Sequence, residues 1–107
     1  MDDLQIDPRL LKQRLEHGDK LLLVDVREPW EHVICRIEGA KLIPMAKLPS
    51  NLPLFEQAGD VVLYCHYGIR SLEAATWLRG RGVEGAQSLA GGIERWANEI
   101  DPGVPHY

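Results

Sequence analysis

The sequence predicts a single α/β domain with a central, mainly parallel five-stranded sheet and helices on both faces. Short apolar runs typical of buried strands alternate along the chain with stretches of helical spacing. The 107 residues suffice for one domain, 1–107, that buries a core without disulfides or metal. The core is expected over about residues 6–100. Residues 101–107, with two prolines, are expected to form an extended C-terminal tail.

The first predicted elements are a short edge strand and a helix. Ile6 begins the strand. Asp7 is a suitable N-cap, and Pro8 follows at the first helical position, where its missing N–H costs nothing. Because Gly18 offers a C-terminal stop, the helix is predicted over about residues 8–17.

A central strand and several short elements follow. The run 21–26 is apolar except for Asp25, which is typical of a central parallel strand. Pro29 stands near the start of a predicted turn and short helix, and a short strand is expected around residues 41–43. Two prolines within residues 45–59 limit that segment to one or two short helices.

The second half repeats the strand and helix pattern. Residues 60–65 predict a buried strand, and residues 71–79 a helix for which Ser71 is the N-cap candidate. A short strand is expected around residues 86–89. The last helix has one apolar face with i, i+3, i+4 and i+7 spacing, formed by Ile93, Trp96, Ala97 and Ile100.

Composition narrows the expected partners and location. The net charge of −4, with no basic block, argues against nucleic-acid binding. No apolar run approaches membrane-spanning length, so no membrane partner is expected. The two cysteines make no disulfide framework, and the histidines show no metal-ligand spacing with them. Residues 1–4 lack the features of a secretory signal, so a reducing, cytoplasmic location is expected.

Cys65 is the candidate nucleophile, because it stands where a strand ends and a helix is about to begin. A helix N-terminus offers unpaired N–H groups and the positive end of the dipole, and a curled loop would point further amides inward. With the charge of Arg70, these features favour the reactive thiolate. Gly68 can take the positive φ that a curl needs. A cysteine that closes an apolar strand is commonly only a core residue, so the prediction depends on Gly68 and Arg70.

This loop resembles the active-site loop of rhodanese-type sulfurtransferases, in which a cysteine starts a six-residue loop that ends in arginine. Related phosphatases and arsenate reductases carry a loop one residue longer. The matching residues are Cys65, His66, Tyr67, Gly68, Ile69 and Arg70, followed by Ser71. Residues 25–28 with 37–40, and residues 89–96, resemble two further signatures of the family. The resemblance covers about residues 6–100 and implies a single rhodanese-like domain.

The resemblance implies transfer of a sulfane sulfur from thiosulfate, or another persulfide donor, through a persulfide on Cys65. The acceptor would be a thiol, cyanide or a protein, and no cofactor or metal is implied. Residues 66–71 would form the anion-binding loop, with His66, Tyr67 and Ile69 at its mouth. Arg70 would bind the donor anion, brace the loop, or do both. In the family, the residues matched by Asp25 and Arg27 support the scaffold near the loop.

Three alternatives remain open on the sequence alone. A phosphatase or arsenate reductase would use the same nucleophile, although the short loop argues against it. A non-enzymatic persulfide carrier or redox and binding module would hold sulfur without turnover. A Cys65–Cys35 disulfide would make the domain a thiol switch. Cys35 replaces a glycine that is common in the second signature, and its simplest interpretation is a small, partly buried hydrophobe.

Overall fold

The computed structural model describes residues 3–107 as an α/β domain with a five-stranded sheet. Met1 and Asp2, part of the N-terminal stretch without signal features, lie outside the described residues. The strands are β1 (Gln5–Ile6), β2 (Leu22–Asp25), β3 (Lys41–Leu42), β4 (Asp60–Tyr64) and β5 (Gly85–Leu89). Their order is β1-β5-β4-β2-β3, and every neighbouring pair is parallel. The predicted sheet is confirmed, and it is wholly parallel.

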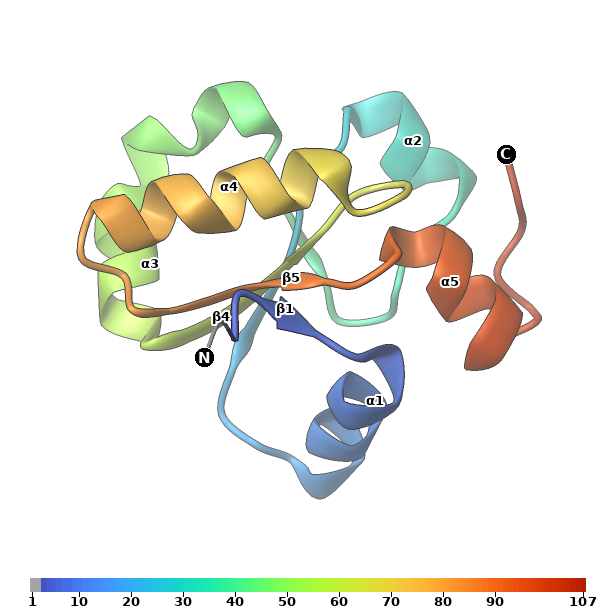
Figure 1. The fold of residues 1–107 in the computed structure, drawn as a ribbon. Helices are drawn as coiled ribbons and strands as arrows, with labels where there is room; N and C mark the ends of the chain where they lie inside the picture. Colours follow the sequence, from blue (N-terminus) through green and yellow to red (C-terminus); the bar gives the residue numbers. More distant parts are fainter. Residues whose placement is uncertain (1–2) are drawn as a thin grey trace.

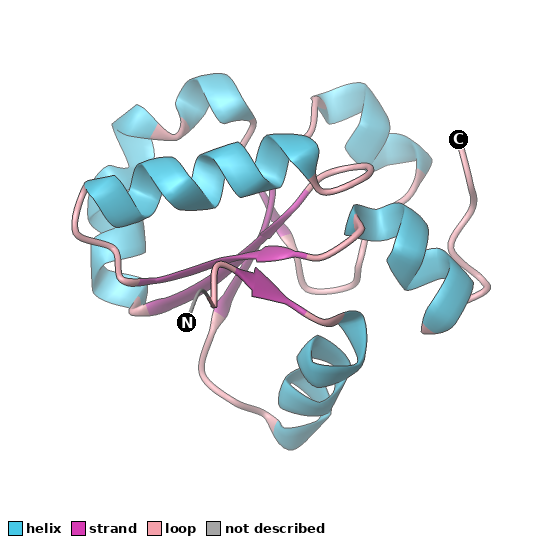
Figure 2. Cartoon of the chain, viewed as in Figure 1, coloured by secondary structure: helices cyan, strands magenta, loops and turns pink. Residues whose placement is uncertain are grey.

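Helices cover both faces of the sheet, as predicted (Figures 1 and 2). The helices are α1 (Pro8–His17), α2 (Pro29–Ile34), α3 (Leu52–Ala58), α4 (Ile69–Gly80) and α5 (Gly92–Glu99), with 3-10 turns at Met45–Lys47 and Pro49–Asn51. One core cluster joins α3 and α4 to the sheet. A second cluster joins α1 and α5 to the opposite face. Both layers are therefore anchored by apolar packing.

Strand β4 supplies both clusters through the alternation of its side chains. Val61 and Leu63, with Cys65 directly after the strand, belong to the α3 and α4 cluster. Val62 and Tyr64 belong to the α1 and α5 cluster. Since successive side chains in a strand point to opposite faces, this alternation makes β4 the centre of the fold and fixes the direction of Cys65.

The first helix forms as the sequence predicts. The Asp7 carboxylate accepts a hydrogen bond from the Arg9 N–H at 2.8 Å, and Gly18 ends the helix with φ 75°. The prediction that Ser71 caps α4 is wrong. That helix begins two residues earlier, at Ile69, after Gly68 with φ 98°. Because the chain bends at Gly68, Ser71 falls inside the first turn and its side chain is directed into the protein.

Residues 101–107 turn back along the domain. Val104 is buried in the α1 and α5 cluster, and Tyr107 reaches the loop before α4. None of the helices within residues 3–107 is long and apolar enough to cross a membrane.

Candidate active site

The Cys65 thiol lies at the carboxyl end of β4, inside the loop that leads to α4. Its Sγ accepts hydrogen bonds from the backbone N–H of Gly68 at 3.1 Å and of Ser71 at 3.3 Å. The residue is only 1% exposed, and the thiol is free. Two amides at the start of a twelve-residue helix therefore point at one sulfur, an arrangement suited to a thiolate or another anion.

Two serine hydroxyls extend this arrangement into the core. Ser71 Oγ lies 3.4 Å from Cys65 Sγ and 2.7 Å from Ser88 Oγ on β5. Both serines are fully buried. When Ser88 donates to Ser71, the Ser71 proton is free to point at the sulfur, so the pair can support a negative charge there. Sequence reasoning missed Ser88, because a lone serine in a strand carries no signal of its partner.

The first turn of α5 anchors the loop through backbone hydrogen bonds. The carbonyl oxygens of Cys65 and His66 accept hydrogen bonds from the N–H groups of Ile93 and Glu94 at 2.9 and 3.0 Å. A Cβ on Gly92 would lie 2.6 Å from the Cys65 oxygen, so only glycine permits this approach. The carbonyls thus face α5. The Gly68 and Ser71 amides face the sulfur.

Arg70 braces the loop against α2, which lies beside it in Figure 1. Its guanidinium donates to both oxygens of Glu31, at 2.7 and 2.9 Å. The Glu31 carboxylate also accepts from the Glu28 N–H at 3.0 Å and the Tyr107 hydroxyl at 2.6 Å. The Arg70 hydrogen bonds, with help from Tyr107, lower the pKa of Glu31 to about 2, although burial opposes the shift. Glu31 therefore stays charged and raises the pKa of Arg70.

An aromatic row lies along the rim of the loop, formed by Trp30, Tyr107, His66 and Tyr67. The His66 ring is stacked between Tyr67, at a centroid distance of 4.1 Å, and Tyr107, at 4.0 Å. Trp30 meets the Tyr107 ring edge-on at 6.1 Å. Burial and the hydrogen bond to Glu31 raise the pKa of Tyr107 to about 12, so its hydroxyl remains protonated and donates.

Asp25 and Arg27 form a fully buried pair next to the loop. Arg27 Nε and Nη2 donate to the two carboxylate oxygens of Asp25, each at 2.8 Å. Arg27 also donates to the Cys35 carbonyl oxygen at 2.6 Å and to the Tyr107 hydroxyl at 2.8 Å. Burial alone would lower the pKa of Arg27, but the hydrogen bonds to Asp25 and Tyr107 outweigh it and raise the pKa.

Two residues named from the sequence lie outside the sulfur's immediate surroundings. His66 Nε2 lies 3.5 Å from a Glu94 oxygen, whose partner oxygen lies 3.1 Å from His106 Nδ1. The hydrogen bond from His106 lowers the pKa of Glu94. Cys35 belongs to the α1 and α5 cluster and Cys65 to the other, so the sheet separates the clusters that hold the two thiols. Both thiols are free.

Sequence reasoning named residues 65–71 as one loop, whereas in the structure the loop ends at Gly68 and residues 69–71 form the first turn of α4. It missed the side chains that surround this segment. Glu31 follows Glu28 by three residues behind a proline, which is at most a weak sign of a helix start. Tyr107 lies 37 positions beyond Arg70 and carries no local signal, and neither does Glu94. Their places depend on tertiary packing.

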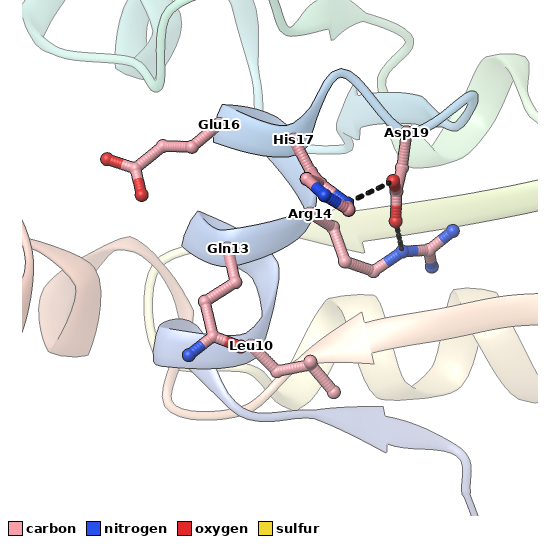
Figure 3. A pocket seen from close by; sticks show the side chains of 6 residues that line it. All are labelled: Leu10, Gln13, Arg14, Glu16, His17 and Asp19. Atoms are coloured by element: carbon pink, nitrogen blue, oxygen red, sulfur yellow. Dashed lines mark hydrogen bonds and ion pairs between the residues drawn. The ribbon is translucent and has the colours of Figure 1, made fainter.

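A depression lies elsewhere on the molecule. It has a volume of about 500 Å³ and is lined by Leu10, Gln13, Arg14, Glu16, His17 and Asp19 (Figure 3). Arg14 pairs there with Asp60, the first residue of β4, at 3.0 Å. This hollow is therefore at the amino end of the strands, away from Cys65. Within residues 3–107 no group of three or more histidine, cysteine, aspartate or glutamate side chains is arranged to hold a metal ion.

Comparisons with known proteins agree on the kind of domain. The family model described as "Rhodanese-like domain" matches residues 7–99. An Allochromatium vinosum protein named "Sulfurtransferase" is 38% identical over 93 residues, which cover 87% of each chain. The Mycobacterium tuberculosis protein "Probable adenylyltransferase/sulfurtransferase MoeZ" is 41% identical over 104 residues, or 95% of this chain. The chain spans only 26% of that relative's length.

Solved structures show the same architecture. The human single-domain sulfurtransferase TSTD1 superposes with a TM-score of 0.80 at 28% identity, covering 92% of this chain and 98% of that one. A rhodanese-like domain protein from Staphylococcus aureus superposes with a TM-score of 0.81 at 31% identity, covering 96% and 97%.

Proposed function

The chain belongs to the rhodanese-like domain family, and we propose that it is a sulfurtransferase that carries sulfur as a persulfide on Cys65. One observation carries the proposal. At the N-terminus of α4, the Cys65 sulfur accepts hydrogen bonds from the backbone N–H groups of Gly68 and Ser71. Donors held in this way stabilise a nucleophilic thiolate, and they equally suit the anionic persulfide that would follow.

The proposed reaction has two steps. The Cys65 thiolate attacks the sulfane sulfur of thiosulfate or another persulfide donor. The new S–S bond takes the place of the donor's own, and sulfite or a thiol leaves with the electron pair. A thiophilic acceptor (cyanide in an assay, a thiol or a protein in the cell) then attacks the outer sulfur of the persulfide and releases the Cys65 thiolate. Covalent catalysis of this kind gives ping-pong kinetics.

The residues around Cys65 would have different roles in positioning the sulfur and its loop. Ser71 would support the charge on sulfur through its N–H and its hydroxyl, which Ser88 orients. Arg70 would keep the loop curled by holding Glu31 on α2. Asp25 and Arg27 would support the same region from within. His66, Tyr67 and Ile69 would line the mouth. Two free thiols are consistent with the reducing, cytoplasmic setting that we propose.

The test is thiocyanate formation from thiosulfate and cyanide by the wild type, with Cys65→Ser and Cys35→Ser alongside. Multiple turnovers that disappear only in Cys65→Ser are expected. A single stoichiometric load of sulfur on Cys65, detected by mass spectrometry, would instead make the domain a carrier. Hydrolysis of p-nitrophenyl phosphate by the wild type would favour the phosphatase alternative.

A further inference from the structure

The rim around Cys65 is apolar and exposed. Tyr67 and Ile69, on either side of Gly68, are 60% and 70% exposed. Trp30 and Val33 on α2 are 60% and 77% exposed. The aromatic row connects Trp30 on α2 to Tyr67 in the loop, and Val33 follows Trp30 by three residues on the same helix. Exposed apolar side chains beside a reactive group can bind the organic part of a substrate.

The positive charge at this rim is already neutralised. Arg70 is held by both oxygens of Glu31 at 2.7 and 2.9 Å. Arg27 is held by Asp25 inside the protein. Glu94 adds a further carboxylate beside His66. Arg70 and Arg27, the two arginines within residues 3–107 that contact the loop or the aromatic row, therefore each have a carboxylate partner, and neither offers an unpaired charge to an arriving dianion. Arg36, beyond α2, donates to the His32 carbonyl oxygen at 3.0 Å.

We infer that the preferred sulfur donor is an organic persulfide, RS–SH, and that thiosulfate is a poor one. This inference rests on the proposed function of Cys65. The thiolate attacks the outer sulfur, the RS–S bond breaks, and the departing RS⁻ takes the proton, so that a thiol and the Cys65 persulfide anion result. A persulfide brings at most one negative charge to the thiolate, whereas thiosulfate brings two. The R group would rest on the aromatic row.

The first experiment measures the rate of Cys65 persulfide formation by mass spectrometry, with thiosulfate, glutathione persulfide or a persulfidated single-cysteine peptide as donor. Wild-type kcat/KM is expected to be about tenfold or more higher for an organic persulfide than for thiosulfate. The faster of the two organic donors identifies a small thiol or a polypeptide as the source. A rate for thiosulfate equal to or above both would overturn the inference.

Glu31→Gln tests the cause of the preference. It removes the carboxylate that neutralises Arg70, so the thiosulfate rate should rise relative to the persulfide rate and the donor ratio should fall about tenfold. Glu56→Gln is the matched control, because Glu56 is exposed on α3 and the change in net charge is the same. An unchanged donor ratio in folded Glu31→Gln, or an equal change in Glu56→Gln, would overturn the inference.

Two measurements remain decisive if Glu31→Gln does not fold. In the wild type, thiosulfate loading should speed up as salt screens the carboxylates at the rim, whereas a free arginine would make it slow down. Trp30→Ala, at an exposed position, should raise KM for the organic persulfide and leave thiosulfate unaffected. The opposite result in either measurement would overturn the inference. Failure of every donor to load Cys65 would instead overturn the proposed function.

Discussion

Two arginine–carboxylate pairs lie beside the active loop, and they differ in what surrounds them. The Asp25–Arg27 pair has no exposed side-chain surface on either partner. In the Glu31–Arg70 pair, the Glu31 side chain is 4% exposed but the Arg70 side chain is 37% exposed. The Tyr107 hydroxyl joins the pairs, since it accepts from Arg27 and donates to Glu31.

The difference in surroundings assigns the pairs different tasks. Arg27 connects Asp25 at the end of β2 with the Cys35 carbonyl and Tyr107, so it ties together three segments that are distant in sequence. A charge buried in this way is costly to leave alone. The Arg70 side chain is partly exposed and lies in the first turn of α4. Losing its partner should therefore lower the free energy of unfolding less than breaking the buried pair. The same chemical pair is thus structural when buried, whereas our inference gives the pair at the rim a part in the choice of sulfur donor.

Breaking the buried pair should have the largest effect. Arg27→Met removes the guanidinium from the buried Asp25 carboxylate, which keeps only His32 Nδ1 at 2.8 Å and the backbone N–H of residue 27 at 3.0 Å. The change is expected to lower the free energy of unfolding by about 3–5 kcal/mol. Arg70→Met is the matched change in the rim pair and should cost less, about 1–2 kcal/mol, because water screens the partly exposed guanidinium although Glu31 is buried. Urea unfolding monitored by tryptophan fluorescence measures both. Equal losses in the two variants would show that burial does not distinguish the pairs.

Tyr107→Phe separates the two pairs without removing a charge. It deletes the hydroxyl that accepts from Arg27 at 2.8 Å and donates to Glu31 at 2.6 Å. The loss should be about 1–3 kcal/mol, because a buried donor is left unsatisfied. The wild type should also show a tyrosine absorbance change near 295 nm centred at about pH 12 that Tyr107→Phe lacks. Titration of the same component at pH 10 would contradict the hydroxyl contacts.

The fold was predictable because its signals are local, whereas much of the site was not. Helix α1 follows from Asp7, Pro8 and Gly18, and the apolar run before Cys65 marks the central strand. Glu31 contacts Arg70 across 39 positions of chain and Tyr107 contacts Glu31 across 76, and no local pattern encodes either contact.

The prediction that Ser71 caps α4 was wrong for a related reason. A serine before an apolar helical face resembles an N-cap, but the positive φ of Gly68 starts the helix earlier. The Ser71 side chain then turns toward Cys65 and Ser88. The spacing of apolar residues correctly predicted the buried face of the helix, but it did not indicate where the backbone bends.

Acid should weaken the rim pair in a defined range. The Arg70 hydrogen bonds lower the pKa of Glu31 to about 2, from 4.5 in an unfolded chain. Stability from a carboxylate with a lowered pKa is present above the unfolded value and is lost as pH falls through the folded one. The wild type should therefore lose stability between about pH 4.5 and pH 2 more steeply than Glu31→Gln. Urea midpoints at a series of pH values measure this, and parallel curves would contradict it.

The smallest effect is expected at Cys35, which touches the buried pair without completing it. Its Sγ lies 3.8 Å from Arg27 Nη1, whereas its carbonyl oxygen, at 2.6 Å from Nη2, is unaffected by a change of side chain. Cys35→Ala should therefore keep sulfur transfer within about twofold of the wild type and cost roughly 1 kcal/mol of stability. Mild oxidation separates this expectation from a thiol switch, because a Cys65–Cys35 disulfide would protect Cys65 from alkylation in the wild type and not in Cys35→Ala. The two thiols belong to core clusters on opposite faces of the sheet, so equal alkylation of Cys65 in both proteins is expected.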